Sequence, residues 1–98
     1  MVVIMYLILV YDIQTDDEDG AKVARTVFKT CKAYLNHIQK SVFEGELSKV
    51  QYLELKNKLF DILRKGKDSC IVFKSRNEKW LDKEFLVEES IDNTSNFI

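Results

Sequence analysis

A single acidic residue stands where a buried strand would end. The segment Val10-Tyr11-Asp12-Ile13 closes an apolar run, so Asp12 would lie at the carboxyl end of a central strand. One interpretation is an aspartate that forms the turn out of the sheet. The other is a ligand for Mg²⁺ or a similar cation such as Mn²⁺, because Mg²⁺ binds one or two carboxylates together with water and phosphate oxygens. A twofold dimer would supply the second carboxylate, and the metal would support phosphodiester hydrolysis.

The rest of the chain offers no other catalytic set. His37 is the only histidine, and it falls at a predicted helix-strand junction without a neighbouring acid or cysteine pair. The sequence has no glycine-rich phosphate loop and no Cys or His cluster with zinc spacing. If the chain is an enzyme, Asp12 is the catalytic candidate.

Basic residues recur along the first predicted helix at i, i+3, i+7 and i+10, namely Lys22, Arg25, Lys29 and Lys32. A solvated outer helix face has this pattern. A surface that binds the nucleic-acid backbone has it too, because phosphate contacts give affinity without sequence preference. Lys40 would extend this basic ridge. Both interpretations stay open.

The charge of the chain is unevenly distributed. The length of 98 residues suits one soluble globular domain, and the formal net charge is −1. Residues 1–20 hold five acids and no base, residues 21–75 hold twelve bases and five acids, and residues 76–98 hold three bases and six acids. A basic middle is compatible with a phosphate-binding face.

The apolar opening run is too short to cross a membrane. Residues 1–10 have no basic flank and no cleavage site, and a span needs about 20 residues. Cys31 and Cys70 fall on apolar faces, which favours buried free thiols over a disulfide. We therefore expect a cytoplasmic protein that does not associate with membranes.

Strands and helices alternate along the chain. An apolar strand over about 2–12 precedes a helix that begins near Ala21, with Asp19 or a neighbour as its cap. Alternating residues over 37–47 predict strand structure, and 68–74 is the last strong strand.

The second helix has clear end signals. Ser48 and Gln51 form a capping box, and the helix presents a broad apolar face that includes Leu53 and Phe60. Gly66 is expected directly after the helix, as its C′ residue.

This order predicts an α+β fold, a ferredoxin-like βαββαβ sandwich. Residues 37–47 must then supply both middle strands. The whole of 1–98 forms one domain, with a core over about 1–75 and a C-terminal extension over 76–98.

Three segments resemble the CRISPR-associated Cas-two family, the small core protein that accompanies the CRISPR integrase. Residues 6–13 are similar to the family's first strand with its terminal Tyr-Asp. Residues 37–47 resemble its Gln-x-Ser-Val-Phe-Glu-Gly signature, and residues 68–73 resemble the strand that opens with Asp-Ser. The similarity covers at least 5–75.

The resemblance implies a homodimer in which an extra C-terminal strand, with Phe97 and Ile98, pairs with the partner's sheet. It implies that Asp12 of each protomer faces the twofold axis and shares a divalent ion, usually Mg²⁺. The implied activity is endonuclease cleavage of RNA or double-stranded DNA. The family's general role is to bridge two integrase dimers in spacer acquisition and to support the DNA fragment to be inserted.

Tyr11, Ser41 and Phe43 belong to the matching segments and join the basic ridge as candidate nucleic-acid contacts. Many family members have arginines soon after the first strand, where this chain has the acids of 16–19. Lys22 and Arg25 would have to replace them.

Other functions remain open from the sequence. The leading hypothesis is a structural, DNA-binding subunit of the acquisition complex that keeps a metal site at Asp12, and hydrolysis at that site is compatible with it. An alternative is a stand-alone, toxin-like endoribonuclease of similar fold. A regulatory module that binds a small ligand ranks last, because three glycines hardly supply a glycine-lined loop. Neighbouring genes would separate these functions.

Overall fold

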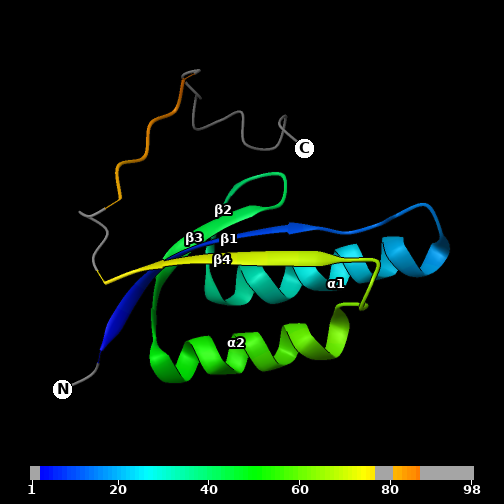
Figure 1. Cartoon of the computed structure of the whole chain (residues 1–98), viewed down its shortest axis with the longest axis horizontal. Coiled ribbons are helices and arrows are strands. Elements are labelled where there is room, and N and C mark those ends of the chain that lie inside the picture. The colour runs from blue at the N-terminus through cyan, green and yellow to red at the C-terminus, as the bar shows by residue number, and fades with distance from the viewer. Residues whose placement is uncertain (1–2, 77–80, 87–98) are drawn as a thin grey trace.

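The chain folds as one antiparallel sheet with two helices (Figure 1). A computed structural model describes residues 3–76 and 81–86. Its elements are β1 (Ile4–Asp12), α1 (Glu18–Tyr34), β2 (Asn36–Gln39), β3 (Val42–Ser48), α2 (Lys49–Ile62) and β4 (Ser69–Ser75). The spatial strand order is β2-β3-β1-β4, with every neighbouring pair antiparallel. This is the predicted ferredoxin-like βαββαβ arrangement.

The two middle strands both come from the single alternating stretch, as predicted. A tight turn at Lys40 and Ser41 separates β2 from β3. Lys40 adopts a φ of 39°, in the left-handed region that few non-glycine residues enter. The Nε2 atom of His37 lies 2.8 Å from the carbonyl oxygen of Lys40, so the only histidine closes this turn.

The core lies between the helices and one face of the sheet. Figure 1 shows both helices on the same side. Every second residue of β1 points toward them. The buried core consists of Leu7, Leu9, Tyr11, Val27, Cys31, Leu35, Phe43, Leu47, Leu55 and Leu59. Cys31 is buried, Cys70 is half-buried, and both are free thiols, as the sequence predicted.

Side-chain caps set where the helices begin. The Asp17 carboxylate accepts a hydrogen bond of 2.6 Å from the Gly20 N–H, so α1 starts at Glu18, earlier than predicted. The predicted capping box of α2 is confirmed, because Ser48 and Gln51 bond to each other's backbone N–H.

Two predictions about α2 were wrong. Its buried face is narrower than expected, because Leu53 and Phe60 are 43% and 67% exposed. The helix ends at Ile62, and Leu63 caps it through an N–H bond to the Leu59 carbonyl. Gly66 therefore is not the C′ residue. It has a φ of 83° in the turn that leads into β4.

The opposite face of the sheet has no helix over it among the described residues. Ile71 and Phe73 of β4 are 55% and 57% exposed there, beside half-buried Val10 of β1. Within the segment 81–86, Lys83 bonds to the carboxylate of Glu44 in β3.

The predicted C-terminal strand lies mostly outside the described residues, and so do Phe97 and Ile98. The described part of the chain contains no helix that is long and apolar enough to span a membrane.

Candidate metal centre and nucleic-acid interface

Asp12 is the last residue of β1 and pairs in register with Ser69, the first residue of β4. Tyr11 points into the core, so strand alternation places Asp12 on the face of the sheet opposite α1 and α2. Its side chain is exposed and makes no hydrogen bond or ion pair within residues 3–76 and 81–86. A carboxylate without a protein partner is available to a cation.

The geometry weighs against a turn-forming role for Asp12. An aspartate that forms a turn accepts a hydrogen bond from the N–H two residues later, which here belongs to Gln14. That N–H instead donates to Oδ1 of Asp68, at 3.2 Å. Asp68 thus has the role in the turn that one interpretation assigned to Asp12.

Arg64 and Asp68 form the most connected polar pair near this strand end. The Asp68 side chain is fully buried. Its carboxylate accepts bonds of 2.9 Å each from the Arg64 backbone N–H, Nε and Nη2. Arg64 Nη2 also donates to the Gln14 carbonyl oxygen at 2.7 Å. The Arg64 guanidinium holds the pKa of the Asp68 carboxyl at about 2, against 3.8 for the unperturbed group.

The acidic run after β1 is used locally. Asp17 caps α1, and its carboxylate lies 3.4 Å from Arg64 Nη1 and 3.7 Å from Lys67 Nζ. The hydrogen bond from the Gly20 N–H makes the largest contribution to lowering the pKa of the Asp17 carboxyl, and the two cations lower it further. Gly20 must be glycine, because a Cβ there would stand 2.0 Å from the Gln14 carbonyl oxygen.

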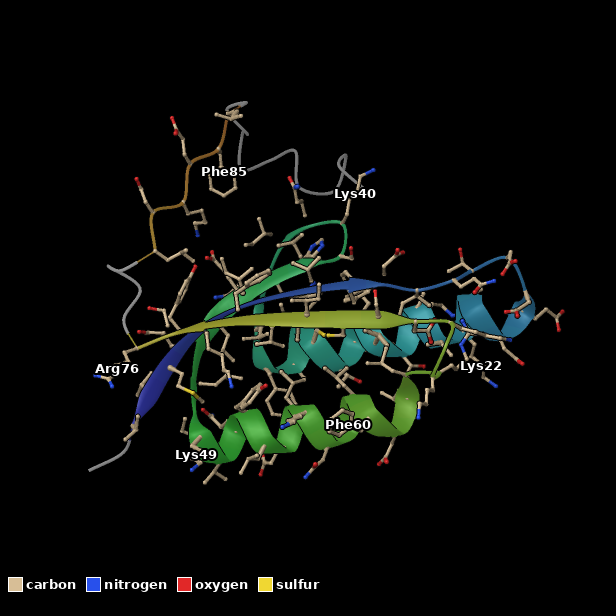
Figure 2. All side chains as sticks on the ribbon, viewed as in Figure 1. Lys22, Lys40, Lys49, Phe60, Arg76 and Phe85 are labelled. Atoms are coloured by element: carbon tan, nitrogen blue, oxygen red, sulfur yellow. The ribbon has the colours of Figure 1, made fainter. Side chains whose placement is uncertain are left out.

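The basic ridge exists as one surface of α1. Lys22, Arg25, Lys29 and Lys32 are all exposed, and none of them forms a salt bridge with another described residue. Figure 2 shows Lys40 at the β2–β3 turn, apart from Lys22 at the start of the ridge. Lys32, at the other end of the ridge, lies over the Phe28 ring, which contacts His37 beside this turn, so a role of Lys40 as an extension of the ridge stays a prediction.

The structure places the other candidate nucleic-acid residues away from the ridge. Tyr11 and Phe43 belong to the core, with stacked rings 6.0 Å apart. Burial, helped by the thiols of Cys31 and Cys70, raises the pKa of Tyr11 to about 12. Ser41 is half-buried, and its carbonyl oxygen accepts the Tyr11 N–H at 3.2 Å. These three residues are therefore placed to position the end of β1.

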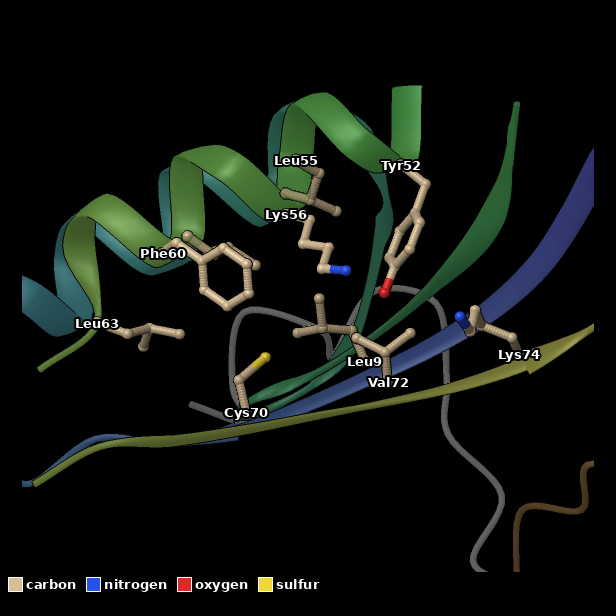
Figure 3. Close-up of a pocket in the computed structure, with 10 residues that line it drawn as sticks. Leu9, Tyr52, Leu55, Lys56, Phe60, Leu63, Cys70, Val72 and Lys74 are labelled. Carbon is tan, nitrogen blue, oxygen red and sulfur yellow. The ribbon is translucent and has the colours of Figure 1, made fainter. Parts of the chain in front are cut away.

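A groove of about 320 Å³ opens between α2 and β4 (Figure 3). Leucines of α2 and Val72 line it, with Lys56 and Lys74 at its rim. It lies on the helix side of the sheet, whereas Asp12 lies on the other, so it does not belong to the Asp12 site.

The described part of a single chain does not form a complete metal site. Within residues 3–76 and 81–86, no three His, Cys, Asp or Glu side chains are grouped to hold one ion. Mg²⁺ takes few protein carboxylates and completes its shell with water and phosphate oxygens. The exposed Asp12 fits that donor set if a second carboxylate comes from another copy.

Comparison with known proteins gives a consistent result. The family model described as CRISPR associated protein Cas2 matches residues 5–83. A protein of Fusobacterium nucleatum named CRISPR-associated endoribonuclease Cas2 is 50% identical over 94 residues, which is 96% of this chain and 87% of the relative. One from Moorella thermoacetica, named CRISPR-associated endoribonuclease Cas2 2, is 39% identical over 94% of this chain and all of its own length.

The fold is shared with a solved structure described as a crystal structure of Cas2. The two structures superpose with a TM-score of 0.75 at 33% sequence identity. The match covers 90% of this chain and 92% of the solved chain.

The Asp68 carboxylate should make stability depend on acid. Its pKa is depressed in the folded state, so its contribution is complete above about pH 4 and is lost as pH falls through about 2. Asp68→Asn should lower the free energy of unfolding at pH 7 by about 1–3 kcal/mol and should flatten the decline below pH 4. Urea unfolding at several pH values measures both effects. Asp61→Asn, at an exposed acid of α2, is the control and should behave as wild type. Equal acid sensitivity in wild type and Asp68→Asn would contradict the assignment.

Proposed function

The chain belongs to the CRISPR associated protein Cas2 family, and from that premise we propose that it is a metal-dependent endonuclease and a subunit of the spacer acquisition complex. The observation that supports the nuclease site is Asp12 itself. It is an exposed carboxylate at a strand end, and Asp68 binds the N–H that it would otherwise need for a turn.

The active form that we propose is a homodimer built through the sheet face opposite α1 and α2. Exposed Ile71 and Phe73 form an apolar surface there with Val10, and such a surface on a small domain favours a partner. Asp12 follows Val10 on the same face. A twofold axis near this strand end would bring both copies of Asp12 together. The extension 76–98 would pair with the partner's sheet.

The two Asp12 carboxylates would hold one Mg²⁺ or Mn²⁺. The bound cation supplies Lewis-acid polarisation of the scissile phosphate and activation of water. The protein's part is to present two carboxylates on a rigid strand end and to leave the remaining positions for water and phosphate oxygens. In this proposal, no other described residue of this face has a role in proton transfer.

The substrate is a nucleic acid, bound by its backbone. The four cations of the α1 ridge are exposed and form no salt bridge with another described residue, so they are available to phosphates. Lys32 also lies over the Phe28 ring, 5.8 Å from its centroid. The names of the curated relatives favour RNA as a substrate. We extend the proposal, on the basis of the family resemblance, to binding of the DNA fragment and bridging of two integrase dimers. The family match favours this role over a stand-alone toxin.

Removal of the Asp12 carboxylate should abolish cleavage. Purified Asp12→Ala, given Mg²⁺ and either single-stranded RNA or duplex DNA, should fall to the rate of a no-enzyme blank, because no other carboxylate replaces the ligand. Asp16→Ala removes an exposed acid four residues later and should keep the wild-type rate. Cleavage by Asp12→Ala at the wild-type rate would place the activity elsewhere.

A charge on the sheet face opposite α1 and α2 should separate the dimer. Phe73→Glu should sediment as a single 11.5 kDa chain, because burying an unpaired carboxylate in an apolar interface is unfavourable. Phe60→Glu is the matched control, since Phe60 is similarly exposed but lies on α2, away from this face. A dimeric Phe73→Glu protein would exclude this interface.

Charge reversal on the ridge should weaken nucleic-acid binding. The double variant Lys29→Glu with Lys32→Glu should lower the affinity for duplex DNA and reduce the slope of log K against log salt by about 2, because two phosphate contacts are lost. The pair Lys49→Glu with Lys65→Glu changes charge equally, at the first residue of α2 and in the turn after it, and should have little effect. An unchanged slope in the first variant would identify the ridge as an ordinary solvated surface.

A further inference from the structure

The end of β1 has a strand neighbour on one side only. Register with β3 stops at Val10, opposite Val42, and the last link on that side is the Tyr11 N–H bond to Ser41. Asp12 still has a partner in β4, where it pairs with Ser69. The position of the Asp12 backbone therefore depends on the start of β4 and on the residues that follow Asp12.

The Arg64–Asp68 pair lies at the start of β4 and binds the chain that follows Asp12. Asp68 directly precedes Ser69. Both backbone groups of Gln14, two residues after Asp12, are bound by this pair: the N–H by Asp68 at 3.2 Å and the carbonyl oxygen by Arg64 at 2.7 Å. The chain is thus fixed on either side of the pairing between Asp12 and Ser69.

The Arg64–Asp68 pair depends on the planar shape of the guanidinium as well as on its charge. Two nitrogens of one planar guanidinium reach the carboxylate, and Nη2 reaches Gln14 in addition. A lysine ammonium cannot reproduce this fork. The close approach of Gly20 to the Gln14 carbonyl leaves the loop little room to shift.

We propose that Arg64 and Asp68 are positioning residues for Asp12, which hold the end of β1 so that two Asp12 carboxylates meet at the spacing that one divalent cation requires. This inference rests on the proposed metal site. Neither residue touches the cation or the substrate, and both act through the Gln14 backbone and the β1–β4 register. Residues that orient a ligand from behind commonly affect metal affinity by about 10–100-fold.

Arg64→Lys tests the role because it keeps the charge and removes the fork. Arg76→Lys, the same substitution at an exposed residue just after β4, is the matched control. We would measure Mn²⁺ binding to the full-length protein by calorimetry, exchange of the Gln14 amide without metal, and RNA cleavage. All variants are compared at a temperature at which circular dichroism shows them folded.

Arg64→Lys should weaken Mn²⁺ binding and lower kcat by about 10-fold or more, with KM for RNA unchanged because the α1 ridge is untouched. The Gln14 amide should exchange faster. Arg76→Lys should match wild type in every measurement. If Arg64→Lys does not fold, Asp68→Asn is the second variant, because it removes the charge that the Arg64 guanidinium binds. Its amide oxygen can still accept the Gln14 N–H, so Mn²⁺ affinity and kcat are the readouts for this variant, and both should fall.

Arg64→Lys could bind Mn²⁺ and cleave RNA as the wild-type protein does, even though its Gln14 amide exchanges faster. That result would overturn the positioning role and leave the pair as a stabilising contact. Failure of the metal site itself gives a different result. In that case Asp12→Ala would bind Mn²⁺ as tightly as wild type, whatever the Arg64 variant does.

Discussion

The structure depends on one constraint, the two-residue alternation of β1 in a sheet whose two described helices lie on the same face. Leu7, Leu9 and Tyr11 must point into the core, so Asp12 must point the other way. A slip of one residue would bury a carboxylate and expose a tyrosine. The same alternation exposes apolar side chains beside Asp12, and it therefore joins the candidate metal ligand to the surface that would bind a second copy.

Most of the fold could be predicted from local signals. The capping box of Ser48 and Gln51 marks the start of α2 without help from the rest of the chain. Residues 37–47 supply two strands because Lys40 adopts a left-handed backbone conformation. No residue type in this segment predicts that conformation. Gly66 misled the prediction, because a glycine in a turn and a glycine that ends a helix look alike in sequence. The helix ends at Ile62, where the Leu63 N–H bonds to the Leu59 carbonyl, and the contacts of Arg64 with Asp68 follow directly after it.

The candidate site was only partly accessible to sequence reasoning. Asp12 stands out because an apolar run ends on it. The bonds from Gln14 to Arg64 and Asp68 join residues 50 and 54 positions apart, and no local pattern reports such a pairing. The spacing of Arg64 and Asp68 around a glycine was the only available signal. Tyr11 and Phe43 attract attention as motif residues, yet burial accounts for both, since they stack in the core beside the strand end.

The central claim is that two Asp12 carboxylates share one cation across a twofold axis. Anomalous scattering from crystals of the wild-type protein grown with Mn²⁺ tests it most directly. The account predicts one anomalous peak on or near the dimer axis, at ligand distance from both Asp12 side chains, about 2.0–2.2 Å as for small hard cations. A dimer in which the two side chains lie far apart, with Mn²⁺ bound elsewhere or to neither, would contradict it.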